Sequence, residues 1–152
     1  RTHLMHVAFE GGEHGRCVEL ADKTLKENAE NRLALLYSGR CFHAMGSFPI
    51  AEERLTRLLE LYPDDRAGRG ALAEVYRAEG KFMEAVEELE QAIAIPGRRP
   101  QAEFLLALGE IYLLELNEPT KAREYLLRFL RTVPPGHPSF DRAKELLGGT
   151  RP

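Results

Sequence analysis

The sequence predicts an all-α solenoid of antiparallel helix pairs, and two observations carry this prediction. Apolar residues recur at three- and four-residue steps along residues 66–95, on both sides of a break at Gly80, which indicates two amphipathic helices joined by a tight turn. The same pattern returns 34 residues earlier and 36 to 37 residues later. A period of this length indicates stacked units that bury their apolar faces against one another.

Three copies of the pattern share small, aromatic, alanine, leucine and proline positions at matching places. These positions are Gly39, Ala73 and Gly109; Phe42, Tyr76 and Tyr112; Ala51, Ala85 and Ala122; Leu55, Leu89 and Leu126; and Pro63, Pro96 and Pro134. The pattern resembles the tetratricopeptide repeat family, although no copy keeps the tryptophan of that family's signature. The resemblance implies a right-handed superhelical solenoid. We expect the small residues to let paired helices approach closely, the aromatic rings to fill the space between repeats, and the prolines to stop the second helices.

The helices follow from this frame in chain order, within a single domain over residues 1–152. A partial repeat at 1–31, which suggests a piece of a longer protein, precedes full repeats at 32–65, 66–101 and 102–136. We expect helices at 2–10, 16–27, 32–45, 48–61, 66–79, 82–95, 101–116 and 119–131. A last helix at 139–147, with Ser139 as its N-cap, is predicted to be a solvating cap, because Lys144 stands where Gly39 and Gly109 stand in other copies. The alternative is a fifth repeat that is cut short.

Composition gives little support for a polyanionic partner or a membrane. The formal net charge is -3 and the pI is near 6.0, which leaves no electrostatic footprint for nucleic acid. The one adjacent basic pair, Arg98-Arg99, is predicted to lie in a solvated loop. No apolar run reaches the length of a membrane span. The sequence does not establish a compartment, although the cytoplasm is slightly favoured.

No motif for catalysis, a metal or a cofactor stands out, so the chain is predicted not to be an enzyme. His3 and His6 are one helical turn apart, but no third ligand follows at helical spacing. Cys17 and Cys41 are interpreted as small core residues rather than as a disulfide framework or a redox motif. On this basis Cys17→Ala is expected to cost little stability.

The resemblance implies that the first helix of each repeat lines a concave groove that holds a peptide or helix of a protein partner. The groove positions that it assigns are His6, Phe9, Leu36, Tyr37, Arg40, His43, Glu74, Arg77, Glu110 and Leu113. The basic clamp by which cochaperone members hold a peptide's C-terminal carboxylate is not rebuilt here, since Tyr37 and Ala71 fall on its positions. Arg40 beside Tyr37 instead predicts a ligand with an acidic group near an apolar or aromatic anchor.

The predicted function is therefore a non-catalytic protein–protein interaction scaffold. The alternative is a self-assembly module of a larger protein, in which two copies form a homodimer through exposed repeat ends.

Overall fold

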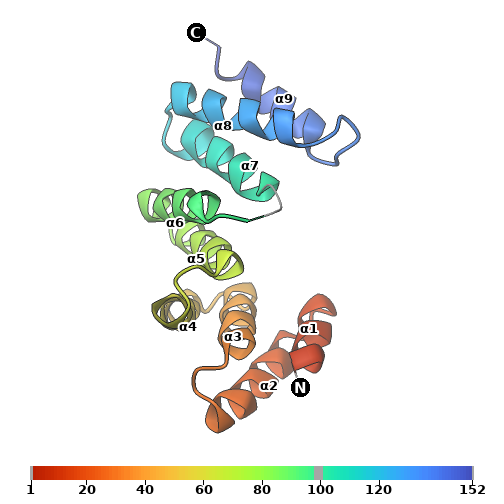
Figure 1. The fold of residues 1–152 in the computed structure, drawn as a ribbon, viewed down its shortest axis with the longest axis vertical. Helices are drawn as coiled ribbons and strands as arrows, with labels where there is room; N and C mark the ends of the chain where they lie inside the picture. Colours follow the sequence, from red (N-terminus) through yellow and green to blue (C-terminus); the bar gives the residue numbers. More distant parts are fainter. Residues whose placement is uncertain (1, 98–100, 152) are drawn as a thin grey trace. The chain divides into compact units, whose positions relative to one another are not determined.

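A computed structural model of the chain describes residues 2–97 and 101–151, and every regular element in these ranges is helical (Figure 1). The predicted all-α fold of consecutive antiparallel helices is thereby confirmed. The chain forms two compact units, residues 1–81 and residues 82–152. Their boundary lies inside the predicted third repeat, directly after the turn at Gly80. The Arg98-Arg99 pair lies outside the described residues.

The first unit holds two helix pairs and one further helix. Its elements are α1 (Thr2–Glu10), α2 (His14–Glu27), α3 (Arg32–Ala44), α4 (Phe48–Leu61) and α5 (Arg66–Ala78). The second unit consists of α6 (Phe82–Ala94), α7 (Ala102–Glu110), the π-helix η1 (Ile111–Glu115), α8 (Pro119–Thr132) and α9 (Phe140–Gly148). All expected helix ends agree with these bounds to within two residues, except where α7 passes into η1.

Small residues set the helix pairing, as the repeat pattern predicted. A Cβ atom on Gly39 would lie 2.5 Å from Leu55 Cδ2, and one on Gly109 would lie 2.5 Å from Leu126 Cδ2. Both leucines are fully buried, and Ala51 and Ala122 on the same partner helices are also 0% exposed. The glycines therefore make room for the leucine of the partner helix, which explains their place in the pattern.

Three turns of the first unit share the same backbone conformation and hydrogen bond. Gly12, Gly46 and Gly80 have φ between 77° and 78°, a left-handed conformation that favours glycine. In each case the next residue donates its N–H to a carbonyl five residues back at 2.8 Å, as Ser47 does to Phe42. This bond satisfies a carbonyl that the end of the helix would otherwise leave without a partner.

In the second unit the extra residue of the fourth repeat is absorbed by η1. The helix that starts at Ala102 widens to π geometry at Ile111, and Glu118 donates to the carbonyl of Tyr112, six residues back, at 2.7 Å. Asn117, with φ 52°, takes the place that glycine holds in the other turns. The extra residue implied by the 37-residue spacing is therefore accommodated partly within the helix, before the turn at Asn117.

Helix α9 packs on α8 through the buried residues Ala143 and Leu146. Ser139 precedes it as expected, although its side chain makes no capping hydrogen bond, and Lys144 is exposed. An exposed lysine is compatible with both a solvating cap and the first helix of a further repeat. The cap therefore stays a prediction.

Candidate partner-binding site

Four of the predicted groove residues meet between α1 and α3. We call His6, Phe9, Tyr37 and Arg40 the platform. His6 Nδ1 lies 2.8 Å from Tyr37 Oη, and the rings of Phe9 and Tyr37 are 5.9 Å apart. The guanidinium carbon of Arg40 lies 5.8 Å from the centre of the Phe9 ring and 6.0 Å from that of Tyr37. The platform therefore combines one cation with two aromatic faces.

Helical spacing explains why these side chains come together. His6 and Phe9 are three residues apart on α1, as Tyr37 and Arg40 are on α3, so each pair lies on one face of its helix. The adjoining strips of the same helices are fixed by packing: Met5 of α1 is fully buried with Ala21 of α2 and Ala34 of α3. This burial orients both helices, so the platform is held by the core behind it.

Arg40 is available for a charged ligand. Over residues 2–97 and 101–151 it makes no ion pair, and its guanidinium lies against two rings while its side chain is half-buried. Contact with an aromatic face is worth about 0.5–2 kcal/mol and leaves the N–H groups at the guanidinium edge able to donate to a carboxylate. Partial burial strengthens such a bond because less water competes for it.

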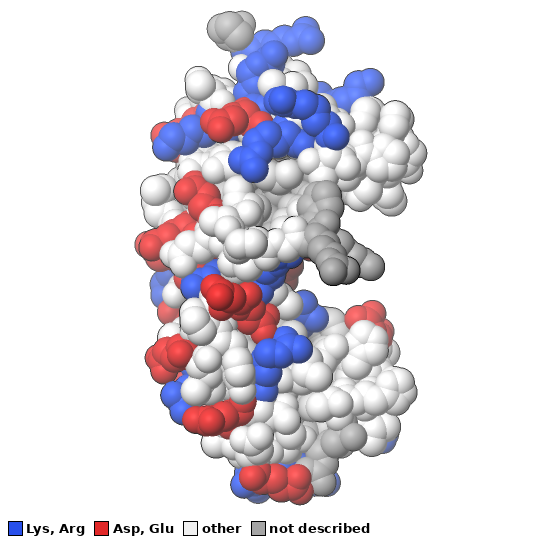
Figure 2. Space-filling model, in the orientation of Figure 1, with Lys and Arg blue, Asp and Glu red and all other residues white. Residues whose placement is uncertain are grey.

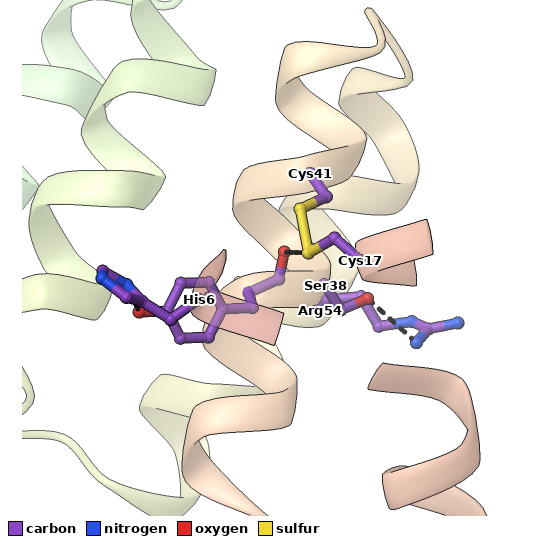
Figure 3. The surroundings of a disulfide bond; sticks show 6 residues. His6, Cys17, Ser38, Cys41 and Arg54 are labelled. Carbon is purple, nitrogen blue, oxygen red and sulfur yellow. Dashed lines mark hydrogen bonds between the residues drawn. A yellow bond between two sulfur atoms is a disulfide. The ribbon is translucent and has the colours of Figure 1, made fainter. Parts of the chain in front are cut away.

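Cys17 and Cys41 form a disulfide (Figure 3), and Phe9 and Tyr37 of the platform pack against the cluster that contains it. The cysteines are fully buried, as the sequence predicted, but the prediction that they do not form a disulfide is wrong. Because Cys17→Ala would break this bridge, the expectation that it costs little stability no longer holds. The bridge joins α2 to α3 with a Cα–Cα distance of 6.5 Å, within the usual range, and Cys17 Sγ lies 3.7 Å from the carbonyl oxygen of Tyr37. Two cysteines 24 residues apart carry no pairing signal of their own, because the packing of α2 on α3 brings them together.

Leu36 and His43, which were also predicted to line the groove, lie outside the platform. Leu36 is only 4% exposed and belongs to a core cluster shared by α3, α4 and α5, so its side chain is not offered to a ligand. It precedes Tyr37 and points about 100° away from it around the axis of α3, which turns it toward α5. His43 is half-buried, and its ring centre lies 5.6 Å from that of Phe48 on α4.

Four further predicted residues lie on other helices. Glu74 is exposed and Arg77 half-buried on α5, in the same unit as the platform. Glu110 and Leu113 belong to the second unit, where Glu110 pairs with Arg142 of α9 at 3.8 Å and Leu113 is half-buried in η1. Their part in binding stays a prediction.

Two features of the first unit were not predicted from the sequence. The ring of His14, at the start of α2, lies 6.0 Å from that of Phe9, and its Nδ1 is buried without a hydrogen-bond partner among the described residues. A cleft of about 920 Å³ also opens between α2 and α4, with Leu25 and Leu35 among its apolar residues and Arg54 among its charged ones. Neither could be foreseen, because each depends on how neighbouring helices are spaced.

The second unit contains a cluster of tyrosines around one carboxylate. Tyr112 donates to Glu90 Oε1 at 2.6 Å, and the Tyr125 ring stacks on that of Tyr112 at 5.8 Å with an interplanar angle of 2°. Burial, together with the Glu90 carboxylate, raises the pKa of both Tyr112 and Tyr125. The cluster ties α6, η1 and α8 together.

Charge is unevenly distributed along the chain. Residues 119–152 contain seven Lys or Arg and three Asp or Glu, although the whole chain has a net charge of -3. Figure 2 shows several of these basic side chains close together over α8 and α9. Some are engaged locally, as Arg123 is with Thr150 Oγ1 at 3.4 Å.

The described residues offer neither a metal-ligand cluster nor a membrane-spanning helix. Among residues 2–97 and 101–151, no group of three or more His, Cys, Asp or Glu side chains is placed to hold a metal ion. None of the helices described is both long enough and apolar enough to cross a membrane.

Comparison with known proteins identifies the family. The sequence profile of the tetratricopeptide repeat matches residues 44–100 and 71–137, which together span more than half of the chain. The chain belongs to the tetratricopeptide repeat family. Repeats of this kind generally act as protein-interaction modules and typically have no catalytic activity.

Solved structures agree with this fold. The crystal structure of MamA matches with a TM-score of 0.82 at 22% sequence identity, and the match covers 96% of this chain and 81% of the MamA chain. TTC0263, a thermophilic repeat protein from Thermus thermophilus, has a TM-score of 0.74 at 23% identity, with 97% and 78% covered. YrrB, a repeat protein described as having an unusual peptide-binding site, has a TM-score of 0.73 at 20% identity, with 86% and 64% covered. At these identities the likeness shows the fold alone.

Proposed function

We propose that the chain is a non-catalytic scaffold that binds a peptide or helix of a protein partner on the platform between α1 and α3. The observation that carries the proposal is the position of Arg40 against two aromatic rings, with no acidic partner among the described residues. Aromatic and arginine side chains are the residue types that contribute most to binding at protein interfaces. The fold of YrrB, which is described as having a peptide-binding site, gives further support.

The platform favours an acidic group next to an apolar or aromatic anchor. Arg40 would bind the carboxylate through two N–H groups, and the faces of Phe9 and Tyr37 would accept the anchor. The hydroxyl of Tyr37 already lies 2.8 Å from the imidazole of His6, which holds the ring in place and reduces the entropy lost on binding.

A peptide-display selection tests this proposal without knowledge of the natural partner. Peptides are selected on the wild-type chain, and each selected peptide is then titrated against Arg40→Ala. We expect an enriched Asp, Glu or C-terminal carboxylate within a few residues of an aromatic or aliphatic residue. Arg40→Ala should weaken binding by at least about fivefold, equivalent to about 1 kcal/mol, with little change in melting temperature.

Controls separate the charge of Arg40 from its geometry. Arg40→Lys keeps the charge but loses the two-pronged donor, so it should restore only part of the affinity. Arg57→Ala on α4, which removes an exposed ion pair to Glu60, should bind as wild type does. Amidated peptides distinguish a C-terminal carboxylate from a side-chain one. Peptides that bind Arg40→Ala as tightly as wild type would place the site elsewhere, with the α2–α4 cleft as the next candidate.

Self-assembly remains the second candidate, because α1 exposes two large apolar side chains. Leu4 is 45% exposed and Val7 is 49% exposed, and the two lie one turn apart on that helix. Light scattering across a concentration series tests the idea. A concentration-dependent dimer that Leu4→Ser abolishes would support it, and a monomer at every concentration would reject it.

A further inference from the structure

We propose that the Cys17–Cys41 disulfide is a redox control on the platform, so that partner binding is strong in the oxidised chain and weak in the reduced one. The inference rests on the proposed function, since it concerns regulation of the same site. The bridge joins α2 to α3 within the cluster on which Phe9 and Tyr37 of the platform pack.

The disulfide and the platform share one packed cluster. Cys17 and Cys41 are buried with Ala8 of α1, and Phe9 and Tyr37 pack against this cluster. Cys41 lies one helical turn after Tyr37 on α3, and Cys17 Sγ is 3.7 Å from the Tyr37 carbonyl oxygen. In Figure 3 the side chains of His6 and Arg54 lie to opposite sides of the bridge. A change at the sulfurs therefore alters the cluster on which Phe9 and Tyr37 pack.

The helices held by the bridge depend on it for their position. Helix α1 has nine residues, too few to be stable alone, and it packs on α2 and α3. The bridge fixes α2 to α3 directly and α1 indirectly. Half of the platform, His6 and Phe9, is carried by α1 and would be released with it.

The redox step needs only a dithiol. One of its thiolates attacks a cysteine sulfur and breaks the S–S bond, and its second thiol then closes the dithiol into a cyclic disulfide. Two electrons and two protons pass to Cys17 and Cys41, which become free thiols. Both sulfurs are 0% exposed, so the attack requires α1 and α2 to open first. A bound partner should therefore slow reduction, because binding and opening exclude each other.

Amide hydrogen exchange tests the inference without any ligand. The chain is compared in its oxidised form and after treatment with dithiothreitol, with the double variant Cys17→Ala/Cys41→Ala as the matched control. We expect reduction to raise exchange in α1 and α2 on the order of a hundred-fold, from the chain entropy that the cross-link removes. The double variant should exchange like the reduced chain under both conditions. Equal protection of α1 and α2 in both redox forms would overturn the inference, as would a loss of protection throughout α3 to α5.

Titration of the tightest selected acidic–aromatic peptide separates this inference from the proposed function. If both hold, dithiothreitol weakens binding at least tenfold in the wild type and leaves the double variant unchanged. Binding that depends on Arg40 but not on dithiothreitol would overturn the redox control and leave the site intact. A third outcome is that reduction speeds hydrogen exchange while Arg40→Ala binds the peptide as tightly as wild type. The opening of α1 and α2 on reduction would then stand, but the platform as the binding site, and its redox control, would be rejected.

Discussion

Replacing Gly39 by alanine adds a single methyl group at the closest approach of α3 and α4. The new Cβ would lie 2.5 Å from Leu55 Cδ2, closer than carbon atoms can pack, and 3.1 Å from Leu55 Cδ1, tighter than most contacts of this kind. Leu55 is fully buried, with Leu35, Ala51 and Leu58 in the same cluster, so it has little room to move. The helices must separate or Leu55 must leave its preferred rotamer.

The magnitude follows from two opposing contributions. Overpacking a well-packed core costs about 1–3 kcal/mol. Alanine regains about 1 kcal/mol over glycine from helix propensity in the interior of α3. The net expected loss for Gly39→Ala is therefore about 1 kcal/mol, and Gly39→Leu should lose more. With a urea m-value of about 2 kcal/mol/M, the unfolding midpoint should fall by about 0.5 M.

Gly15→Ala is the matched control for this measurement. A Cβ on Gly15 has no heavy atom within 4 Å, so the same methyl group should be neutral or stabilising by up to about 1 kcal/mol on α2. Urea unfolding followed by circular dichroism compares both variants with wild type at equal m-values. If Gly39→Ala gained stability as Gly15→Ala does, the close packing of Gly39 on Leu55 would be refuted.

Three further predictions concern other parts of the chain. Asp65 caps α5 by accepting from Gly68 N at 2.8 Å and also accepts from Arg32 Nη1 at 2.7 Å, so Asp65→Ala should cost about 1–3 kcal/mol in urea unfolding; an unchanged midpoint would contradict this. Asn117 has φ 52°, so Asn117→Ala should lower the melting temperature and Asn117→Gly should not, and equal melting of the two variants would oppose the idea. The raised pKa of Tyr112 means that the folded state holds this proton more tightly than the unfolded state does. Its contribution is complete below about pH 10 and is lost as the pH rises further, so Tyr112→Phe should reduce the loss of stability that the wild type shows above about pH 10.

The sequence alone established the helices and their pairing. Gly46 and Gly80 mark turns 34 residues apart, and Ala51 and Leu55 mark the buried face of α4, the first of the two helices between them, so spacing was sufficient to predict both. This works because a repeat contacts mainly its neighbours, and the information that specifies a contact therefore lies close by in the chain. The widening of α7 at Ile111 could not be predicted in this way. The repeat spacing shows that the fourth repeat has an extra residue, but it does not show which helical turn accommodates that residue.

Only the tertiary structure decided which residues form the candidate site. Tyr37, Arg40 and Leu36 are close neighbours on α3, yet the first two lie against α1 while Leu36 is buried toward α5. The pairing of Cys17 with Cys41 likewise depends on where α2 crosses α3. A helical pattern fixes the direction of a side chain around its own axis, but the neighbour that it meets depends on the distance and angle between helices, which are set by packing.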